Sequence, residues 1–144
     1  MFRLERGRLA ALGFGRPLFF PNGIAVDPAA GRLFVADAEG IMVQDIATAR
    51  SWQLAPETTS IAAIDGMVWH EGALIAVQNQ TIPARLLRIR PDSAARRAAV
   101  EMLSADPALG NSATVAVTDG EAFVYSRPAD GDAGGRPKLL RVRL

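Results

Sequence analysis

One short phrase occurs twice in this chain, and its spacing constrains the fold more than any other feature. The phrase Asn-Gly-Ile-Ala-Val at 22–26 precedes an apolar run at 31–37, and Asp-Gly-Met-Val-Trp at 65–69 precedes another at 72–77. Gly23 and Gly66, at the same place in each copy, lie 43 residues apart. A period near 40 residues with short apolar runs is typical of stacked antiparallel sheets. The sequence therefore predicts an all-β repeat protein.

Short runs of apolar residues bounded by Gly, Pro, Asp and Asn predict a meander of strands. The predicted strands lie near 23–27, 32–37, 41–46 and 51–55 in one unit, and near 66–69, 73–78, 85–90 and 97–103 in the next. A third unit starts near Asn111 and closes with 139–144, and residues 2–12 form two outer strands of an earlier unit. Gly31, Gly72 and Gly120 close turns, where glycine tolerates a positive φ.

The segment 92–109 has two interpretations. It is rich in Ala and Arg, which form helices readily, and Asp92 or Ser93 would serve as an N-cap. The repeat instead requires an outer strand at 97–103, and we favour the strand.

Units of four strands and about 40 residues predict a β-propeller. The predicted fold class is therefore all-β, a partial β-propeller over residues 1–144 with about three four-stranded antiparallel blades. Residues 1–14 would be outer strands of a preceding blade, 21–60 and 61–105 two blades, and 111–144 a final, incomplete blade.

Composition excludes several classes of function. The formal net charge of +1 gives no global attraction to nucleic acid or to an acidic membrane. With no cysteine there is no disulfide, thiolate metal site or cysteine nucleophile. No apolar run approaches the roughly 18 residues of a spanning helix, and the N-terminus has no signal-type stretch. We expect no nucleic-acid or membrane partner and a cytoplasmic location, although a longer parent chain would be able to carry an export signal.

The repeated phrases resemble one known family. Residues 21–37, 64–69 with 72–77, and the terminal run at 139–142 resemble blades of the senescence marker protein/gluconolactonase/luciferin-regenerating enzyme family. The resemblance covers almost the whole chain but maps to the second half of a six-bladed propeller. Similar text occurs in strictosidine-synthase-like and NHL-repeat propellers.

The resemblance implies a divalent cation in the central channel, with Asn22 and Asp65 as two of its ligands and Asp65 also as a candidate general base. Amide and carboxylate oxygens suit Ca²⁺, which we expect first, with Mg²⁺, Mn²⁺ or Zn²⁺ as alternatives. The family's remaining ligand, a Glu of the first blade, and its sugar-binding Asn and Arg have no counterpart here.

Other readings of the same residues stay open. Asn and Asp before Gly are common turn residues. Asn111 repeats the register but is followed by Ser112, so we interpret it as a turn or cap. His70 is predicted at a surface turn, Asp37 and Glu39 in a turn near the channel mouth, and Trp52 and Trp69 between blades.

Two functions follow as hypotheses. The first is divalent-metal-dependent hydrolysis of a sugar lactone or related ester, a small-molecule substrate, by the complete protein. The second is a non-catalytic propeller segment that binds a partner or small ligand. Three blades cannot close a ring, which leaves three possibilities. The chain is a fragment of a longer propeller, a homodimer that completes the ring, or an open array with exposed strand edges, and we favour the fragment.

Overall fold

Strands account for most of the computed structural model, which describes residues 1–127 and 135–144. Those residues contain one short 3-10 helix, η1 (Pro107–Leu109), and no α-helix, and none of their helical structure is long and apolar enough to cross a membrane. The strands are β1 (Phe2–Glu5), β2 (Arg8–Ala11), β3 (Ile24–Asp27), β4 (Arg32–Asp37), β5 (Gly40–Asp45), β6 (Ser51–Pro56), β7 (Ile64–His70), β8 (Ala73–Gln78), β9 (Arg85–Pro91), β10 (Arg97–Ser104), β11 (Asn111–Thr118), β12 (Glu121–Arg127) and β13 (Lys138–Arg143).

The strands form successive antiparallel meanders. β3-β4-β5-β6 is the first, which we call blade 1, and β7-β8-β9-β10 is the second, blade 2. Their outermost strands touch in a short parallel pairing in which Ala55 and Pro56 oppose Arg97 and Ala98. This contact makes the two blades one eight-stranded sheet. The strand predicted at 97–103 is confirmed as β10, and the alternative helix over 92–109 is wrong apart from the single turn of η1.

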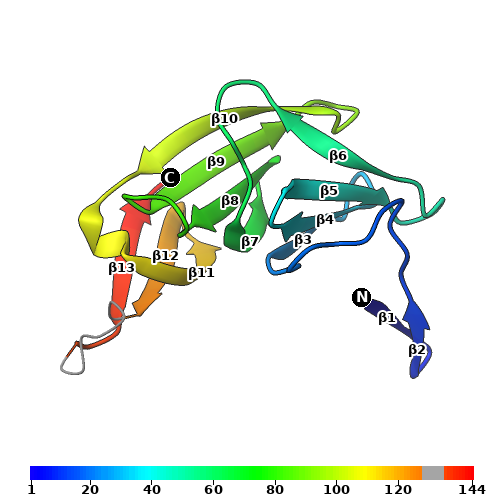
Figure 1. The fold of residues 1–144 in the computed structure, drawn as a ribbon, viewed down its shortest axis with the longest axis horizontal. Helices are drawn as coiled ribbons and strands as arrows, with labels where there is room; N and C mark the ends of the chain where they lie inside the picture. Colours follow the sequence, from blue (N-terminus) through cyan, green and yellow to red (C-terminus); the bar gives the residue numbers. More distant parts are fainter. Residues whose placement is uncertain (128–134) are drawn as a thin grey trace.

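The remaining strands form smaller sheets. β11-β12-β13 makes a three-stranded sheet, blade 3, and β1 pairs only with β2 in a hairpin. Figure 1 shows the three blades side by side along an arc, with β3 and β7 toward its inner side and β6 and β10 along its outer side, while the β1–β2 hairpin projects away from them. Every residue of β1 and β2 is exposed. The predicted all-β partial propeller is confirmed.

Two hydrophobic clusters hold the blades together, and both include residues of β8. All six residues of β8 are buried because blades 1 and 3 cover its two faces: Leu74 and Ala76 belong to the cluster shared with blade 1, and Ile75 and Val77 to the cluster shared with blade 3. The turn glycines behave as predicted. Gly31, Gly72 and Gly120 have φ values of 62°, 76° and 73°.

Both tryptophans lie between blades 1 and 2, as predicted. The ring of Trp69 in β7 stacks on Phe34 in β4, with centroids 5.3 Å apart and planes 12° apart. Trp52 in β6 donates its indole N–H to the carbonyl of Ala95 in the β9–β10 turn, at 2.7 Å. The Arg96 guanidinium lies 4.3 Å from the centroid of the Trp52 ring. Aromatic contacts of these kinds add to the apolar area that they bury.

The repeated glycines have a role that the turn chemistry of their neighbours does not indicate. A Cβ on Gly66 would lie 2.7 Å from the Cα of Thr114 and 2.9 Å from the carbonyl oxygen of Ala113, both in β11. A Cβ on Gly23 would lie 3.1 Å from the carbonyl oxygen of Asp65 in β7. Glycine at these two positions therefore lets the innermost strands of successive blades approach backbone to backbone.

Candidate functional site

The close approach of the inner strands brings the two predicted site residues together. Asn22 immediately precedes Gly23 and β3, and Asp65 is the second residue of β7, directly before Gly66. The Asn22 amide Nδ2 donates a hydrogen bond to Asp65 Oδ1. β7 begins at Ile64, earlier than the predicted residue 66, so Asp65 lies within the strand. The pair therefore spans blades 1 and 2 at one end of their innermost strands.

A third residue, Asn79, completes this cluster, although its sequence context did not assign it to the site. Asn79 directly follows β8. Its Nδ2 donates to Asp65 Oδ2 at 2.5 Å and to the backbone carbonyl of Ser112 in β11 at 2.8 Å. The available sequence signal is a polar residue directly after a fully buried strand. We call the series of contacts from Asn22 through Asp65 and Asn79 to the Ser112 carbonyl the amide–carboxylate chain, and it links all three blades.

An open cavity of about 530 Å³ lies beside the amide–carboxylate chain. Asn22 is exposed and Asp65 is half-buried, so the carboxylate is accessible from this cavity. The lining residues are Phe20, Asn22, Asp37, Ala38, Ala63, Ile64, Asp65 and Gln80. The cavity draws on blades 1 and 2 and has the size of a small-molecule site.

The donor set fits a hard cation in type but is short in number. The Asn22 amide oxygen and the Asp65 carboxylate are the kinds of ligand that Ca²⁺ and Mg²⁺ prefer, whereas Ca²⁺ takes six to eight oxygens. Both Asp65 oxygens already accept amide N–H groups, so a cation would require the Asn22 amide to turn its oxygen inward. Over residues 1–127 and 135–144 no three His, Cys, Asp or Glu side chains gather into a metal-binding group.

Asp37 lines the same cavity but is committed to other contacts. Asp37 was predicted in a turn, and its Oδ1 accepts the backbone N–H groups of the turn residues Glu39 and Gly40 at 3.0 and 3.1 Å. Oδ2 lies 2.7 Å from Arg16 Nη1, and the Asp37 side chain is wholly buried. Burial by itself would raise the pKa of Asp37, but the hydrogen bonds from Arg16, Glu39 and Phe19 outweigh it and the pKa lies below its ordinary value. Asp37 is therefore held ionised as an anchor for the segment that precedes β3.

The third copy of the repeat contributes the backbone carbonyl of Ser112 to the amide–carboxylate chain, but the Asn111 side chain, at the register of Asn22 and Asp65, has a different partner. Asn111, predicted at a turn or cap, is instead the first residue of β11, and its Oδ1 accepts a hydrogen bond from Arg127 at 3.4 Å. Ser112, which replaces the repeated glycine, donates its hydroxyl to the carbonyl of Leu109 in η1. The side chain of Ser112 therefore points toward η1. His70 ends β7 half-buried, 3.8 Å from Glu71, and is remote from the chain of contacts.

The fold and the convergent inner strands define the class of protein as a partial β-propeller. A scan against protein-family models finds no match, and a search of the curated proteins finds none either. Solved structures do match in fold. The structure of a putative oxidoreductase (glucose dehydrogenase) from Thermus thermophilus matches with a TM-score of 0.65 at 18% identity, covering 94% of this chain and 47% of that one.

Two further propeller-like neighbours give the same result. The PQQ-bound aldose sugar dehydrogenase from Streptomyces coelicolor has a TM-score of 0.57 at 17% identity, covering 85% of this chain and 42% of its own. The allergen Mala s 1 of Malassezia sympodialis has a TM-score of 0.58 at 16% identity, covering 93% of this chain and 44% of its own. The chain thus spans under half the length of each neighbour. At these identities the likeness establishes the fold alone, and membership of the gluconolactonase-type family stays a prediction.

Proposed function

We propose that this chain is part of a sugar-related enzymatic propeller whose site includes the amide–carboxylate chain and hydrolyses a sugar lactone or related ester with a divalent cation. The observation that carries the proposal is the contact between Asn22 and Asp65, two oxygen-bearing side chains from different blades at an open cavity. The names of two neighbours, a glucose and an aldose sugar dehydrogenase, support a sugar-related role at a coarse level.

In this proposal the residues have separate tasks. The Asn22 carbonyl and the Asp65 carboxylate would hold the cation, and Asn79 would fix the orientation of Asp65 through its hydrogen bond to Oδ2. A bound cation would supply Lewis acidity for an ester carbonyl and acidify a water molecule. Asp65, accessible from the cavity, would then accept the proton of the attacking water. Asn22 and Asp65 supply fewer ligands than a cation requires, so further ligands would have to come from water, from other groups that line the cavity, such as Gln80, or from further blades.

Metal binding is the first test. We expect millimolar Ca²⁺ to raise the melting temperature of the chain, because a ligand that binds the native state alone stabilises it. A ligand present at tenfold its dissociation constant would add about 1.4 kcal/mol to the free energy of unfolding. Mg²⁺, Mn²⁺ and Zn²⁺ are titrated in parallel. Asp65→Asn, which keeps the shape and removes the charge, should abolish the response, whereas Asp119→Asn, at the exposed β11–β12 turn, should keep it.

Catalysis is the second test, measured as acid release from glucono-δ-lactone in a pH-stat with and without the stabilising metal. Metal-dependent hydrolysis that disappears in Asp65→Asn and persists in Asp119→Asn supports the proposal. If none of the four cations changes the melting temperature, or if Asp65→Asn responds like the unchanged chain, the metal site does not exist and the enzymatic proposal fails.

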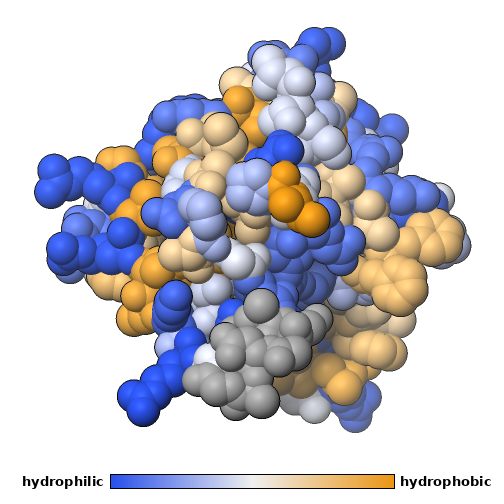
Figure 2. Space-filling model, turned by 60° about the vertical axis from the view of Figure 1, so that its left-hand side comes forward, coloured by the Kyte–Doolittle hydropathy of each residue, from blue (hydrophilic) through white to orange (hydrophobic). Residues whose placement is uncertain are grey.

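The runner-up is a non-catalytic propeller segment that binds a partner on a blade face. It is favoured by the outward face of blade 3, where Tyr125 and Leu139 are neighbours across β12 and β13 and are 39% and 68% exposed. Figure 2 brings this side forward and shows apolar residues interspersed with hydrophilic ones. A second copy or further blades would cover this face. Light scattering tests the homodimer: a clean, stable monomer at high concentration would rule it out.

A further inference from the structure

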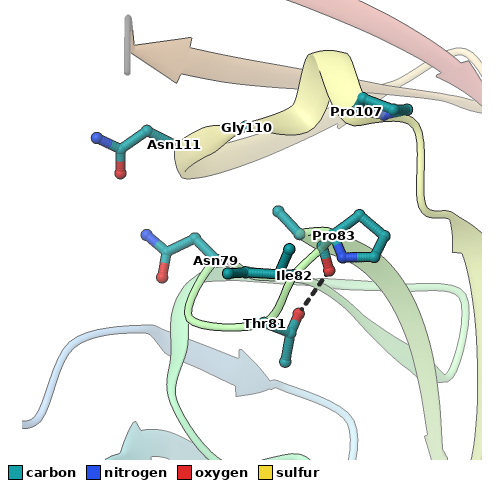
Figure 3. Close-up of a pocket in the computed structure, with 8 residues that line it drawn as sticks. Asn79, Thr81, Ile82, Pro83, Pro107, Gly110 and Asn111 are labelled. Carbon is teal, nitrogen blue, oxygen red and sulfur yellow. Dashed lines mark hydrogen bonds between the residues drawn. The ribbon is translucent and has the colours of Figure 1, made fainter. Parts of the chain in front are cut away.

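A second cavity, of about 620 Å³, lies between the β8–β9 loop and the segment from η1 to β11 (Figure 3). Its described lining residues are Asn79, Thr81, Ile82, Pro83, Ala84, Pro107, Gly110 and Asn111. It is separate from the cavity beside Asn22, and the Asn79–Gln80 step divides the two: Asn79 lines this one and Gln80 the other. We call it the loop pocket.

The loop pocket combines apolar walls with uncharged polar groups. Ile82 is fully exposed, and with Pro83 it forms an apolar side on the loop, while Pro107 lies across the gap on the η1 side. Its polar side chains are two amides and one hydroxyl, and none of the described lining residues is ionisable. A charged ligand would find no countercharge among the described lining side chains, whereas a neutral ligand needs none.

The polar groups are held in fixed positions. Thr81 Oγ1 lies 2.9 Å from the carbonyl of Pro83, the bond drawn in Figure 3, which fixes the loop and leaves lone pairs on the hydroxyl oxygen. The Nδ2 group of Asn79 donates its hydrogen bonds to Asp65 and to the Ser112 carbonyl, so its Oδ1 is the atom that would accept a hydrogen bond from a ligand. Asn111, on the opposite side of the gap, has its Oδ1 engaged by Arg127 and its Nδ2 available to donate.

We propose that the loop pocket binds a neutral cyclic polyol, a compound whose ring carries hydroxyl groups on its edge and C–H groups on its faces. The ring faces would pack on Ile82 and Pro83, and the hydroxyl groups would bond Asn79 Oδ1, Thr81 Oγ1 and Asn111 Nδ2. The volume of the loop pocket lies within the range of small-molecule sites, about 300–1,000 Å³. The inference rests on the lining of the loop pocket and requires no metal at Asp65.

The test uses two probes with similar hydroxyl groups and different charge: 1,5-anhydro-D-glucitol, which is neutral and cyclic, and D-gluconate, which is anionic. Binding is measured by isothermal titration calorimetry and by saturation-transfer NMR, in EDTA so that metal has no part. We expect the anhydroglucitol to bind with a millimolar dissociation constant and gluconate to bind at least about tenfold more weakly.

Variants locate the binding. Ile82→Asp places a carboxylate on the apolar wall without disturbing the core, because Ile82 is fully exposed, and should weaken anhydroglucitol binding by about fivefold or more. Asn111→Ala should weaken it by a similar factor. Leu9→Asp, a matched change on the exposed β1–β2 hairpin, should leave the dissociation constant unchanged.

Three results would overturn the proposal: no binding of the neutral probe, gluconate bound as tightly as anhydroglucitol through Arg127, or equal losses in Ile82→Asp and Leu9→Asp. The outcome is independent of the metal test. Polyol binding in EDTA with no metal-induced stabilisation would retain the loop pocket and reject the hydrolase, and the reverse pattern would retain the metal site and reject the loop pocket.

Discussion

Replacing Gly66 by alanine tests the idea that the repeated glycine exists to let inner strands meet. The new Cβ would lie 2.7 Å from the Cα of Thr114, where ordinary contact begins near 3.4 Å. Because both nearest atoms belong to the backbone of β11, no side chain can move aside, and blades 2 and 3 would have to separate locally by about 0.7 Å. A gap of that size removes a quarter to half of the dispersion energy of the contacts across it.

The magnitude follows from two opposing effects. Overpacking of this kind costs about 1–3 kcal/mol, and the backbone contact favours the upper end of that range. Alanine also reduces the freedom of the unfolded chain, which offsets about 0.4–1 kcal/mol. We therefore expect Gly66→Ala to lower the free energy of unfolding by about 2 kcal/mol. Urea unfolding followed by tryptophan fluorescence measures it.

Two matched variants make the result interpretable. Gly13→Ala should leave the free energy of unfolding unchanged or raise it by up to about 1 kcal/mol, because nothing lies within 4 Å of the position that its new methyl group would take and its φ is not positive. Gly23→Ala should cost about 1 kcal/mol, since one of its two close neighbours is the flexible side chain of Met67. If Gly66→Ala proves as stable as Gly13→Ala, the close-approach explanation of the repeated glycine is refuted.

Three further substitutions test contacts between elements. Asp37→Asn should lose about 1.5–3 kcal/mol at neutral pH, the value of a hydrogen bond to a charged group, because Arg16 loses Asp37 but keeps Glu39 at 3.3 Å. The folded pKa of Asp37 is lowered, so its stabilisation is present above the ordinary pKa of 3.8 and lost on further acidification. The unfolding free energy of the variant should therefore fall less steeply below about pH 4, and an unchanged acid slope in urea titrations would contradict this. Phe34→Ala should cost about 3–5 kcal/mol by removing a fully buried ring stacked on Trp69, and a loss under about 1 kcal/mol in chemical denaturation would argue against that packing. Trp52→Phe should cost about 1–2 kcal/mol through the lost indole hydrogen bond, checked by thermal melting, and an unshifted midpoint would show that the bond carries no net stability.

Local patterns were enough to predict most of the strands. Gly31 and Gly72 take the positive φ expected of hairpin turns, and Leu87 and Ile89 are fully buried as their alternation with arginines indicates. These features depend on neighbours in sequence, because turn geometry and the two-residue period of a strand are local. In β5, residues 41–44 are all buried although Gln44 is polar. The Gln44 amide donates to the carbonyl of Gly13, because the segment before β3 covers the face of β5 that lies away from blade 2.

The candidate site was half predictable. The repeated phrases and the family resemblance that they carry pointed to Asn22 and Asp65, which hold the same place before the repeated glycine in successive copies. Asn79 was not assigned to the site, because a polar residue after a strand is common in any sheet. Only the packing of blade 2 against blade 3 lets Asn79 contact both Asp65 and the Ser112 carbonyl. Asn111 shows the converse: it keeps the register, but its side chain accepts a hydrogen bond from Arg127 and not from a member of the amide–carboxylate chain.

The sequence by itself determined that this protein is built of repeated antiparallel sheets and that an oxygen-bearing residue, Asn22 or Asp65, recurs before the repeated glycine, because both follow from period and local turn chemistry. Tertiary structure decided what the recurring residues do. Gly23 and Gly66 serve the approach of one blade to the next, and Asp65 is held by amides from either side, contacts between residues distant in sequence that depend on how the blades pack.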